Sequence, residues 1–182
     1  LGTALAAWRS PFPPSGEAVF DAWLGEPEEG RRIGRQLYRF ARRNGLFSVE
    51  VEATFEAAPA DDGLEQSGPF NHRSLEEWRD GWLSLLVSDT RIGAARHRLR
   101  AVRESEALRG HRDGLAFTAA GYLIPSSLWH PDTPLVPGLI DSIAGRVRLV
   151  RGRDLGTESL RIADATRATR HYRLLGELSR EL

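Results

Sequence analysis

His72 and a set of aromatic residues are the side chains best suited to chemistry. His72 changes charge near neutral pH, so it is the candidate general base. Trp78 and Trp82 are four residues apart, a spacing that places both rings on one face of a helix, where they either pack in the core or cover an apolar pocket. Under the second interpretation, the candidate substrate-binding residues are Asn71, Trp78, Trp82, Tyr122, Trp129 and His130.

The chain lacks several residue types that other kinds of site require. It has no cysteine, which excludes a thiolate nucleophile and a cysteine-ligated zinc ion. All 25 basic residues are arginine, which excludes a Schiff-base lysine and the lysine of a phosphate-binding loop. The five histidines are scattered and form no HExxH motif, so we expect no metal site.

Length and charge are typical of an ordinary globular protein. The 182 residues fit a single domain over 1–182. The 25 basic residues balance 25 acidic ones, which argues against nucleic acid as a partner. No apolar run approaches the roughly 20 residues that span a bilayer, and no signal-peptide pattern is seen, so we expect a cytoplasmic protein without membrane contact.

Hydrophobic spacing predicts two helices followed by a strand in the first third of the chain. Apolar residues recur at helical spacing over 15–24 and again over 28–44, and Gly45 is suited to end the second helix. Residues 46–55 alternate between apolar and polar side chains, which indicates a half-buried strand.

The helix expected over 28–44 is unusually rich in arginine. Its side chains either bind a phosphate or an acidic partner, or form a solvated face that pairs with nearby glutamates. The residues concerned are Arg31, Arg32, Arg35, Arg39, Arg42 and Arg43.

The rest of the chain predicts further helices and short strands. Ser74 and Glu77 have the spacing of a capping box, and the helices that follow suggest a lid-like helical insertion over 57–110. A strand over 114–124 precedes a proline-rich linker over 125–145.

A short strand over 146–150 and a final helix over 158–182 complete the pattern. Together these elements predict an α/β fold class, with a mixed sheet and flanking helices, or a small α+β domain.

One segment resembles a known family. Gly30 to Glu52, which reads GRRIGRQLYRFARRNGLFSVEVE, is similar to the last large helix and the following strand of class I S-adenosylmethionine-dependent methyltransferases. The sequence TAAGYLI at 118–124 resembles their closing strand. The resemblance covers residues 18–124 and implies a Rossmann-like methyltransferase fold with S-adenosylmethionine as the cofactor.

Two hypotheses about function follow. The resemblance implies a small-molecule methyltransferase, or part of one, with His72 as the base if the reaction uses one. The family's glycine-rich cofactor loop is missing from this sequence, so no cofactor-binding residue can be assigned. The alternative is therefore a non-enzymatic α/β ligand-binding or protein-interaction module without a cofactor site. Under either hypothesis the expected partners are a small molecule and, for an oligomer, a second copy of the chain.

Overall fold

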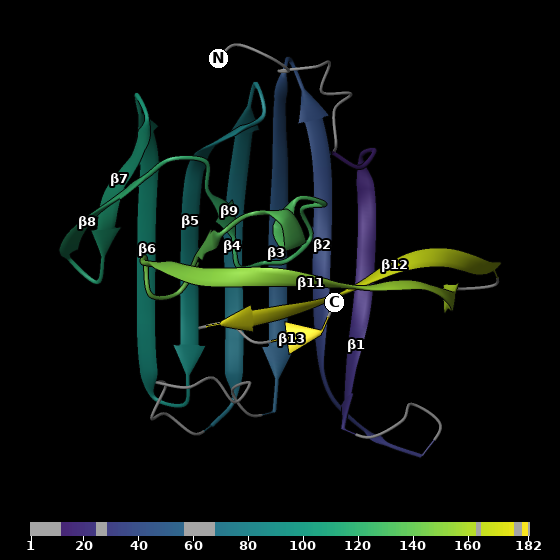
Figure 1. The fold of residues 1–182 in the computed structure, drawn as a ribbon. Coiled ribbons are helices and arrows are strands. Elements are labelled where there is room, and N and C mark those ends of the chain that lie inside the picture. The colour runs from purple at the N-terminus through teal and green to yellow at the C-terminus, as the bar shows by residue number, and fades with distance from the viewer. Residues whose placement is uncertain (1–11, 25–28, 57–67, 163–164, 177–179, 182) are drawn as a thin grey trace, which may run out of the picture.

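Two β-sheets make up the described part of this computed structural model, which comprises residues 12–24, 29–56, 68–162, 165–176 and 180–181 (Figure 1). No α-helix occurs among these residues, and their one helical element is the 3-10 turn η1 (Thr133–Leu135).

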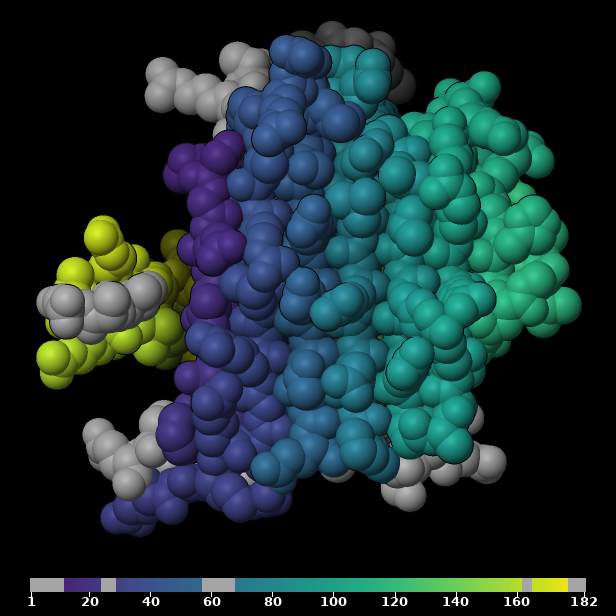
Figure 2. Space-filling view, turned by 180° about the vertical axis from the view of Figure 1, so that it is seen from behind, coloured from purple at the N-terminus to yellow at the C-terminus, as the bar shows by residue number. Residues whose placement is uncertain are grey.

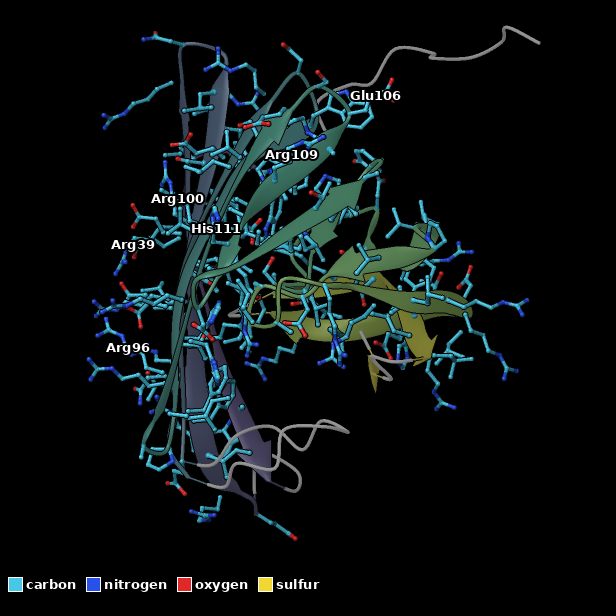
Figure 3. The ribbon with its side chains drawn as sticks, turned by 90° about the vertical axis from the view of Figure 1, so that its left-hand side faces the viewer. Arg39, Arg96, Arg100, Glu106, Arg109 and His111 are labelled. Atoms are coloured by element: carbon cyan, nitrogen blue, oxygen red, sulfur yellow. The ribbon has the colours of Figure 1, made fainter. Side chains whose placement is uncertain are left out.

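The larger sheet contains eight antiparallel strands, each paired with its neighbours in the chain. It is curved, and its concave face is covered by the rest of the protein (Figures 1 and 3). The strands are β1 (Gly16–Leu24), β2 (Arg31–Arg43), β3 (Leu46–Phe55), β4 (Phe70–Arg79), β5 (Trp82–Ile92), β6 (Ala95–Glu104), β7 (Ala107–Arg112) and β8 (Leu115–Ala120).

Tight turns join several of these strands. Asn44-Gly45 connects β2 to β3, Asp80-Gly81 connects β4 to β5, and Asp113-Gly114 connects β7 to β8. All six residues have positive φ angles, as a two-residue type I′ hairpin requires. Gly45 thus takes the left-handed conformation expected for it, but in a hairpin and not at the end of a helix.

The smaller sheet runs crosswise over the concave face of the larger one (Figure 1). Residues 121–145, here called the covering segment, contribute β9 (Ile124–Pro125) and β10 (Gly138–Ile140) to it. The long strands β11 (Val147–Ile162) and β12 (Ala165–Gly176) form a hairpin that extends past β1, and β13 (Arg180–Glu181) pairs with β12 (Figures 1 and 2).

The main hydrophobic core lies between the concave face and the covering segment. Strand β3 places Phe47, Val49 and Val51 there, and each is almost fully buried. Ile124, Leu139 and Ile140 of the covering segment pack against the same cluster. The covering segment is therefore an integral layer of the fold.

This architecture shows that the predicted fold class was wrong: the protein is all-β, not α/β. The strand over 46–55 is confirmed as β3, and the strand expected over 114–124 overlaps β8. The expected helices are strands where the structure describes them: β1 in 15–24, β2 in 28–44, β4 to β7 in the insertion at 57–110, and β11 and β12 in 158–182.

Strand β2 shows why the helical spacing misled. Apolar side chains occur on both of its faces: Tyr38 and Phe40 pair with buried residues of β3 and point into the core, whereas Ile33 and Leu37 line a groove on the opposite face. The two interleaved sets of apolar residues imitate the period of a helix.

Candidate functional site

The inward-facing side of β4 carries polar side chains in the core. Every second residue from Phe70 to Trp78 is buried, and the three between these two are His72, Ser74 and Glu76. A strand that faces a hydrophobic core normally buries apolar residues, and buried carboxylates are rare without a cation partner. We therefore take this row of buried polar residues as the starting point for the candidate site.

Glu76 is fully buried and is held by two tryptophans. Its Oε2 accepts a hydrogen bond from the indole Nε1 of Trp129 at 2.8 Å and a longer one from Trp78 Nε1 at 3.4 Å. Burial raises the pKa of the carboxyl to about 7, although these donors and the nearby Ser127 act to lower it. Glu76 is thus a carboxyl group that titrates near neutral pH inside the core.

Several polar atoms around Glu76 have no hydrogen-bond partner of regular geometry. They include the second carboxyl oxygen, Glu76 Oε1, the hydroxyl of Ser127 and Nε2 of His130, all inaccessible to solvent. Such groups are costly in a core unless a water, an ion or a ligand satisfies them.

Aromatic rings, two of them from the tryptophans that hold this carboxyl, surround the ring of Phe12. The Phe12 ring stacks on Phe47 with their centroids 4.5 Å apart. Trp78, Trp129 and His130 surround it at centroid distances of 5.6, 5.9 and 5.6 Å. Trp78 and Trp129 stand nearly perpendicular to each other, with an interplanar angle of 84°. We call the space bounded by Phe47, Trp78, Trp129 and His130 the aromatic recess.

The covering segment brings two walls of the recess to the sheet. The Tyr38 hydroxyl on β2 donates a hydrogen bond to the Ser127 carbonyl at 2.6 Å, next to Trp129 and His130. The His130 ring stacks on Trp78 at 4.9 Å, and its Nδ1 accepts the backbone N–H of Asp132. Burial lowers the pKa of His130 to about 4, so this wall is a neutral imidazole at neutral pH.

Five of the six predicted substrate-binding residues lie in one continuous aromatic chain. Trp78, Trp129 and His130 bound the recess. The ring centroids of Tyr122 and His130 are 6.5 Å apart, and those of Trp82 and Tyr122 are 5.5 Å apart. They meet because strands β4 and β5 and the covering segment bring them together, and not because they share a helix.

The sixth predicted binding residue, Asn71, and the predicted base, His72, lie elsewhere. Asn71 is exposed on the outer face of β4. His72 is buried beside a separate small cluster of Ala53, Phe70 and Ile92, and its Nδ1 lies 2.7 Å from Thr90 Oγ1. Burial lowers the pKa of His72 to about 4, so the structure gives it a neutral ring in a packed environment.

Sequence reasoning missed Glu76, Phe12 and Phe47 as residues of this site. Reading 74–109 as helical hid Glu76, because it would then have lain in the first turn of a helix, between Ser74 and Glu77 of the capping box, where acidic residues are usually exposed. The Asp80-Gly81 dipeptide was the available signal, since it predicts a hairpin whose first strand buries every second residue, Glu76 and Trp78 included.

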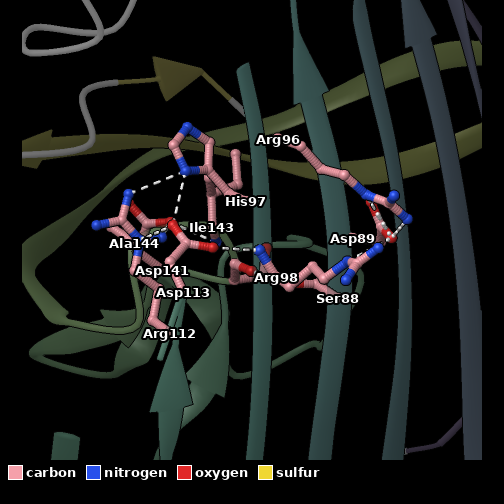
Figure 4. A network of polar contacts seen from close by, with 11 residues as sticks. Ser88, Asp89, Arg96, His97, Arg98, Arg112, Asp113, Asp141, Ile143 and Ala144 are labelled. Carbon is pink, nitrogen blue, oxygen red and sulfur yellow. Dashed lines mark hydrogen bonds and ion pairs between the residues drawn. The ribbon is translucent and has the colours of Figure 1, made fainter. Parts of the chain in front are cut away.

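Further polar contacts lie around strands β5 to β8 and the adjoining part of the covering segment (Figure 4). Asp113 Oδ1 accepts a hydrogen bond from the Arg98 backbone N–H at 2.7 Å, and Asp113 Oδ2 lies 2.9 Å from His97 Nδ1. Asp89 pairs with both Arg96 and Arg98. Figure 3 shows Arg39, Arg96 and Arg100 extending from the convex face, away from the core.

Neither a metal site nor a membrane-spanning helix is found in the described ranges. Among those residues, no three His, Asp or Glu side chains are grouped so as to hold a metal ion. None of their helical segments has the length and apolar character needed to cross a bilayer.

Comparison with known proteins identifies a family. No curated protein matches the chain, and no solved structure does. The methyltransferase resemblance was wrong, because the described residues form an all-β architecture without the flanking helices of that fold. A family model described as a domain of unknown function, DUF6134, matches residues 28–182. The chain therefore belongs to the DUF6134 family.

Proposed function

We propose that this protein is a non-enzymatic binding module that holds the alkylammonium group of a small molecule in the aromatic recess. The observation that carries this proposal is a buried carboxyl, Glu76, at the indole N–H edges of two tryptophans that wall the recess. His72, the expected base, lies in another cluster, so the recess combines binding groups without a neighbouring catalytic histidine of ordinary pKa.

The chemistry of the walls favours a cation. Aromatic faces attract ammonium groups, most strongly where water is excluded, and a set of several rings around one position is the usual device for binding them. Phe47, Trp78 and Trp129 provide three such rings.

Glu76 supplies the complementary charge. No cation contributes to its raised pKa, which is set by burial against three neutral donors. An ammonium group would compensate the carboxylate, and one with an N–H would also give Oε1 a hydrogen bond of regular geometry. The recess therefore suits a primary alkylammonium group better than a neutral molecule of the same size.

Phe12 stands where such a ligand would bind. Its ring contacts all four wall residues and is only partly buried, so it fills the recess and closes it towards solvent. A ligand must displace this ring, and the wild-type affinity is then reduced by the free energy of opening.

Titration with n-butylammonium, followed by tryptophan fluorescence and calorimetry, tests the proposal. Phe12→Ala is expected to bind this cation about tenfold more tightly than the wild type, because the recess is already open. Phe20→Ala is the matched control: it removes an exposed phenyl ring outside the recess and leaves the affinity unchanged.

Two further measurements separate charge from cavity filling. Glu76→Gln in the Phe12→Ala background is expected to abolish n-butylammonium binding, and n-butanol, a neutral molecule of the same length, is expected to bind at least about tenfold more weakly than the cation. Equal binding of the alcohol and the cation, or no binding of the cation to a folded Phe12→Ala variant, overturns the proposal.

The pH dependence gives an independent readout. Because the pKa of Glu76 is about 7, the carboxylate that pairs with the cation forms as the pH rises through that value. The affinity for n-butylammonium is therefore expected to increase from pH 6 to pH 8, and the Glu76→Gln variant should show no such increase.

A further inference from the structure

Exposed arginines and a histidine lie close together on the convex face of the larger sheet, over strands β5 to β7. Arg96, Arg98 and Arg100 occupy alternate positions of β6, so their side chains share one face at steps of about 7 Å. In the antiparallel register, Arg91 of β5 lies opposite Arg96, and His111 of β7 lies opposite Arg100. All five are exposed. We call these residues the arginine face.

Positive charge exceeds negative charge on this face. Asp89 pairs with Arg96 and Arg98 together, so one carboxylate serves two guanidinium groups. No ion pair with Arg91 or Arg100 is found among the described residues. The surplus is local, because β1 to β3 carry Glu17, Asp21, Glu50 and Glu52 around their own arginines.

A shallow groove follows the β6 and β7 part of the arginine face, and Arg91 borders the neighbouring pocket on the β4 side. It has a volume of about 720 Å³ and is open to solvent. The β6 arginines line it together with His111 and two carboxylates, Asp89 and Asp113, and Asp113 is paired with Arg112 beside the groove. An open groove of this kind suits a chain that passes along the surface, whereas a small ligand is usually held in an enclosed pocket.

We propose that the arginine face binds a linear polymer of phosphate groups along strand β6. Guanidinium groups match phosphate oxygens with paired hydrogen bonds, and a straight row of them fits successive anionic groups of one chain. Binding is electrostatic and releases counterions, so it weakens steeply as salt is added.

The composition of the groove separates this partner from two other anions. Single-stranded nucleic acid is held by aromatic rings that stack on its bases, and no Phe, Tyr or Trp is among the described residues that line the groove. Stable binding to an anionic membrane usually combines basic residues with apolar side chains that insert between the lipids. On β6, Val102 alone of the exposed residues is a large hydrophobic one.

The test uses long-chain inorganic polyphosphate as the probe, titrated from about 50 to about 200 mM sodium chloride. Oligothymidylate of equal charge and vesicles containing phosphatidylglycerol are the comparison probes. Polyphosphate is expected to bind at least about tenfold more tightly than either at the same salt concentration. Tighter binding of the oligonucleotide or of the vesicles overturns the proposed partner.

Neutral variants locate the site. Arg91→Gln and Arg100→Gln are each expected to lower the salt-dependence slope by about one unit, because each removes one phosphate contact. Arg43→Gln is the matched control, since it removes an exposed arginine at the end of β2 and should leave the slope unchanged. Equal effects of all three substitutions would show that only net charge matters, and would overturn the proposed site.

One substitution is expected to strengthen binding, which damage to the fold cannot do. Asp89→Asn releases Arg96 and Arg98 from their shared carboxylate and removes one negative charge from the groove. Polyphosphate affinity should rise about fivefold, the effect of one charge near an anionic chain. Unchanged or weaker binding by a folded Asp89→Asn variant would contradict the assignment of the groove.

Discussion

Trp129 of the covering segment donates its indole N–H to the carboxyl of Glu76 on β4, with 2.8 Å between Nε1 and Oε2. The bond links two layers of the fold 53 residues apart in the chain and ends on a group that titrates near neutral pH. The attachment of the covering segment is therefore coupled to the protonation of one buried side chain.

Glu76→Gln is expected to be more stable than the wild type at neutral and alkaline pH. The pKa of Glu76 rises from 4.5 to about 7 on folding, so the protonated form favours the native state. The stabilisation is complete below about pH 4.5, declines as the pH rises to 7, and is absent above it. The variant should therefore be more stable than the wild type at pH 8 by up to about 3 kcal/mol. Urea unfolding at pH 5 and pH 8 measures this difference, with the exposed Glu106→Gln as the control, and a Glu76→Gln curve parallel to that of the wild type would contradict it.

His72→Gln tests the opposite pH range. Burial lowers the pKa of His72 from 6.5 to about 4 in the folded protein, so the unfolded chain binds the proton more readily. Wild-type stability should fall as the pH decreases from 6.5 to 4, and the variant should lack this contribution, of about 3 kcal/mol. Thermal unfolding across this range provides the measurement. His130 is present in both proteins, so its own titration cancels in the comparison. If the difference in stability between the wild type and His72→Gln is the same at pH 7 and at pH 4, the assignment is refuted.

Asp141 and Arg148 form an ion pair that is almost entirely buried, with 2.6 Å between Arg148 Nε and Asp141 Oδ2. The second oxygen of Asp141 accepts the backbone N–H groups of Ile143 and Ala144. Asp141→Ala removes all three interactions and breaks a buried ion pair, so we expect a loss of roughly 3–5 kcal/mol. Arg148→Met should cost less, because the two backbone donors still hold the carboxylate. Chemical denaturation of both variants gives the order, and the reverse order would contradict this account.

Gly152→Ala is expected to prevent close packing of β11 on the covering segment. A Cβ atom at this position would lie 1.9 Å from the Pro134 carbonyl oxygen, and backbone cannot rotate away as a side chain can. We expect a loss of at least about 3 kcal/mol, in the range of severe core overpacking. Ser159→Ala, at an exposed position of the same strand, is the control for the measurement of the melting temperature. Equal melting temperatures of the two variants would show that β11 can shift without cost.

The local pattern was sufficient only where one face of a strand is apolar and the other is polar. Strand β3 meets this condition: Phe47, Val49 and Val51 face inward and alternate with Ser48 and Glu50. Strand β4 does not, because the buried positions between Phe70 and Trp78 hold polar residues, so no alternation of hydrophobicity is visible. In such strands, the Asn-Gly and Asp-Gly dipeptides were the better guide, since a positive φ at both positions specifies a hairpin.

A register shift in the larger sheet was a second reason why the sequence pattern predicted helices in place of strands. The register between β4 and β5 shifts after Glu77, which changes the residues that face the core beyond that point. Trp78, Leu83 and Leu86 are therefore all buried, although their spacing does not follow a period of two. Spacing of this kind resembles a helix, and only the pairing of strands distinguishes the two.

Residue types and short-range alternation were enough to specify strand β3 and the left-handed position of Gly45, because these depend on the chain within a few residues. The all-β architecture, the burial of Glu76 with its pKa near 7, the separation of His72 from the aromatic recess and the grouping of arginines over β5 to β7 depend on which strands become neighbours. Strand pairing is non-local: it brings together residues far apart in the chain, and it alone determines which face of each strand is removed from water.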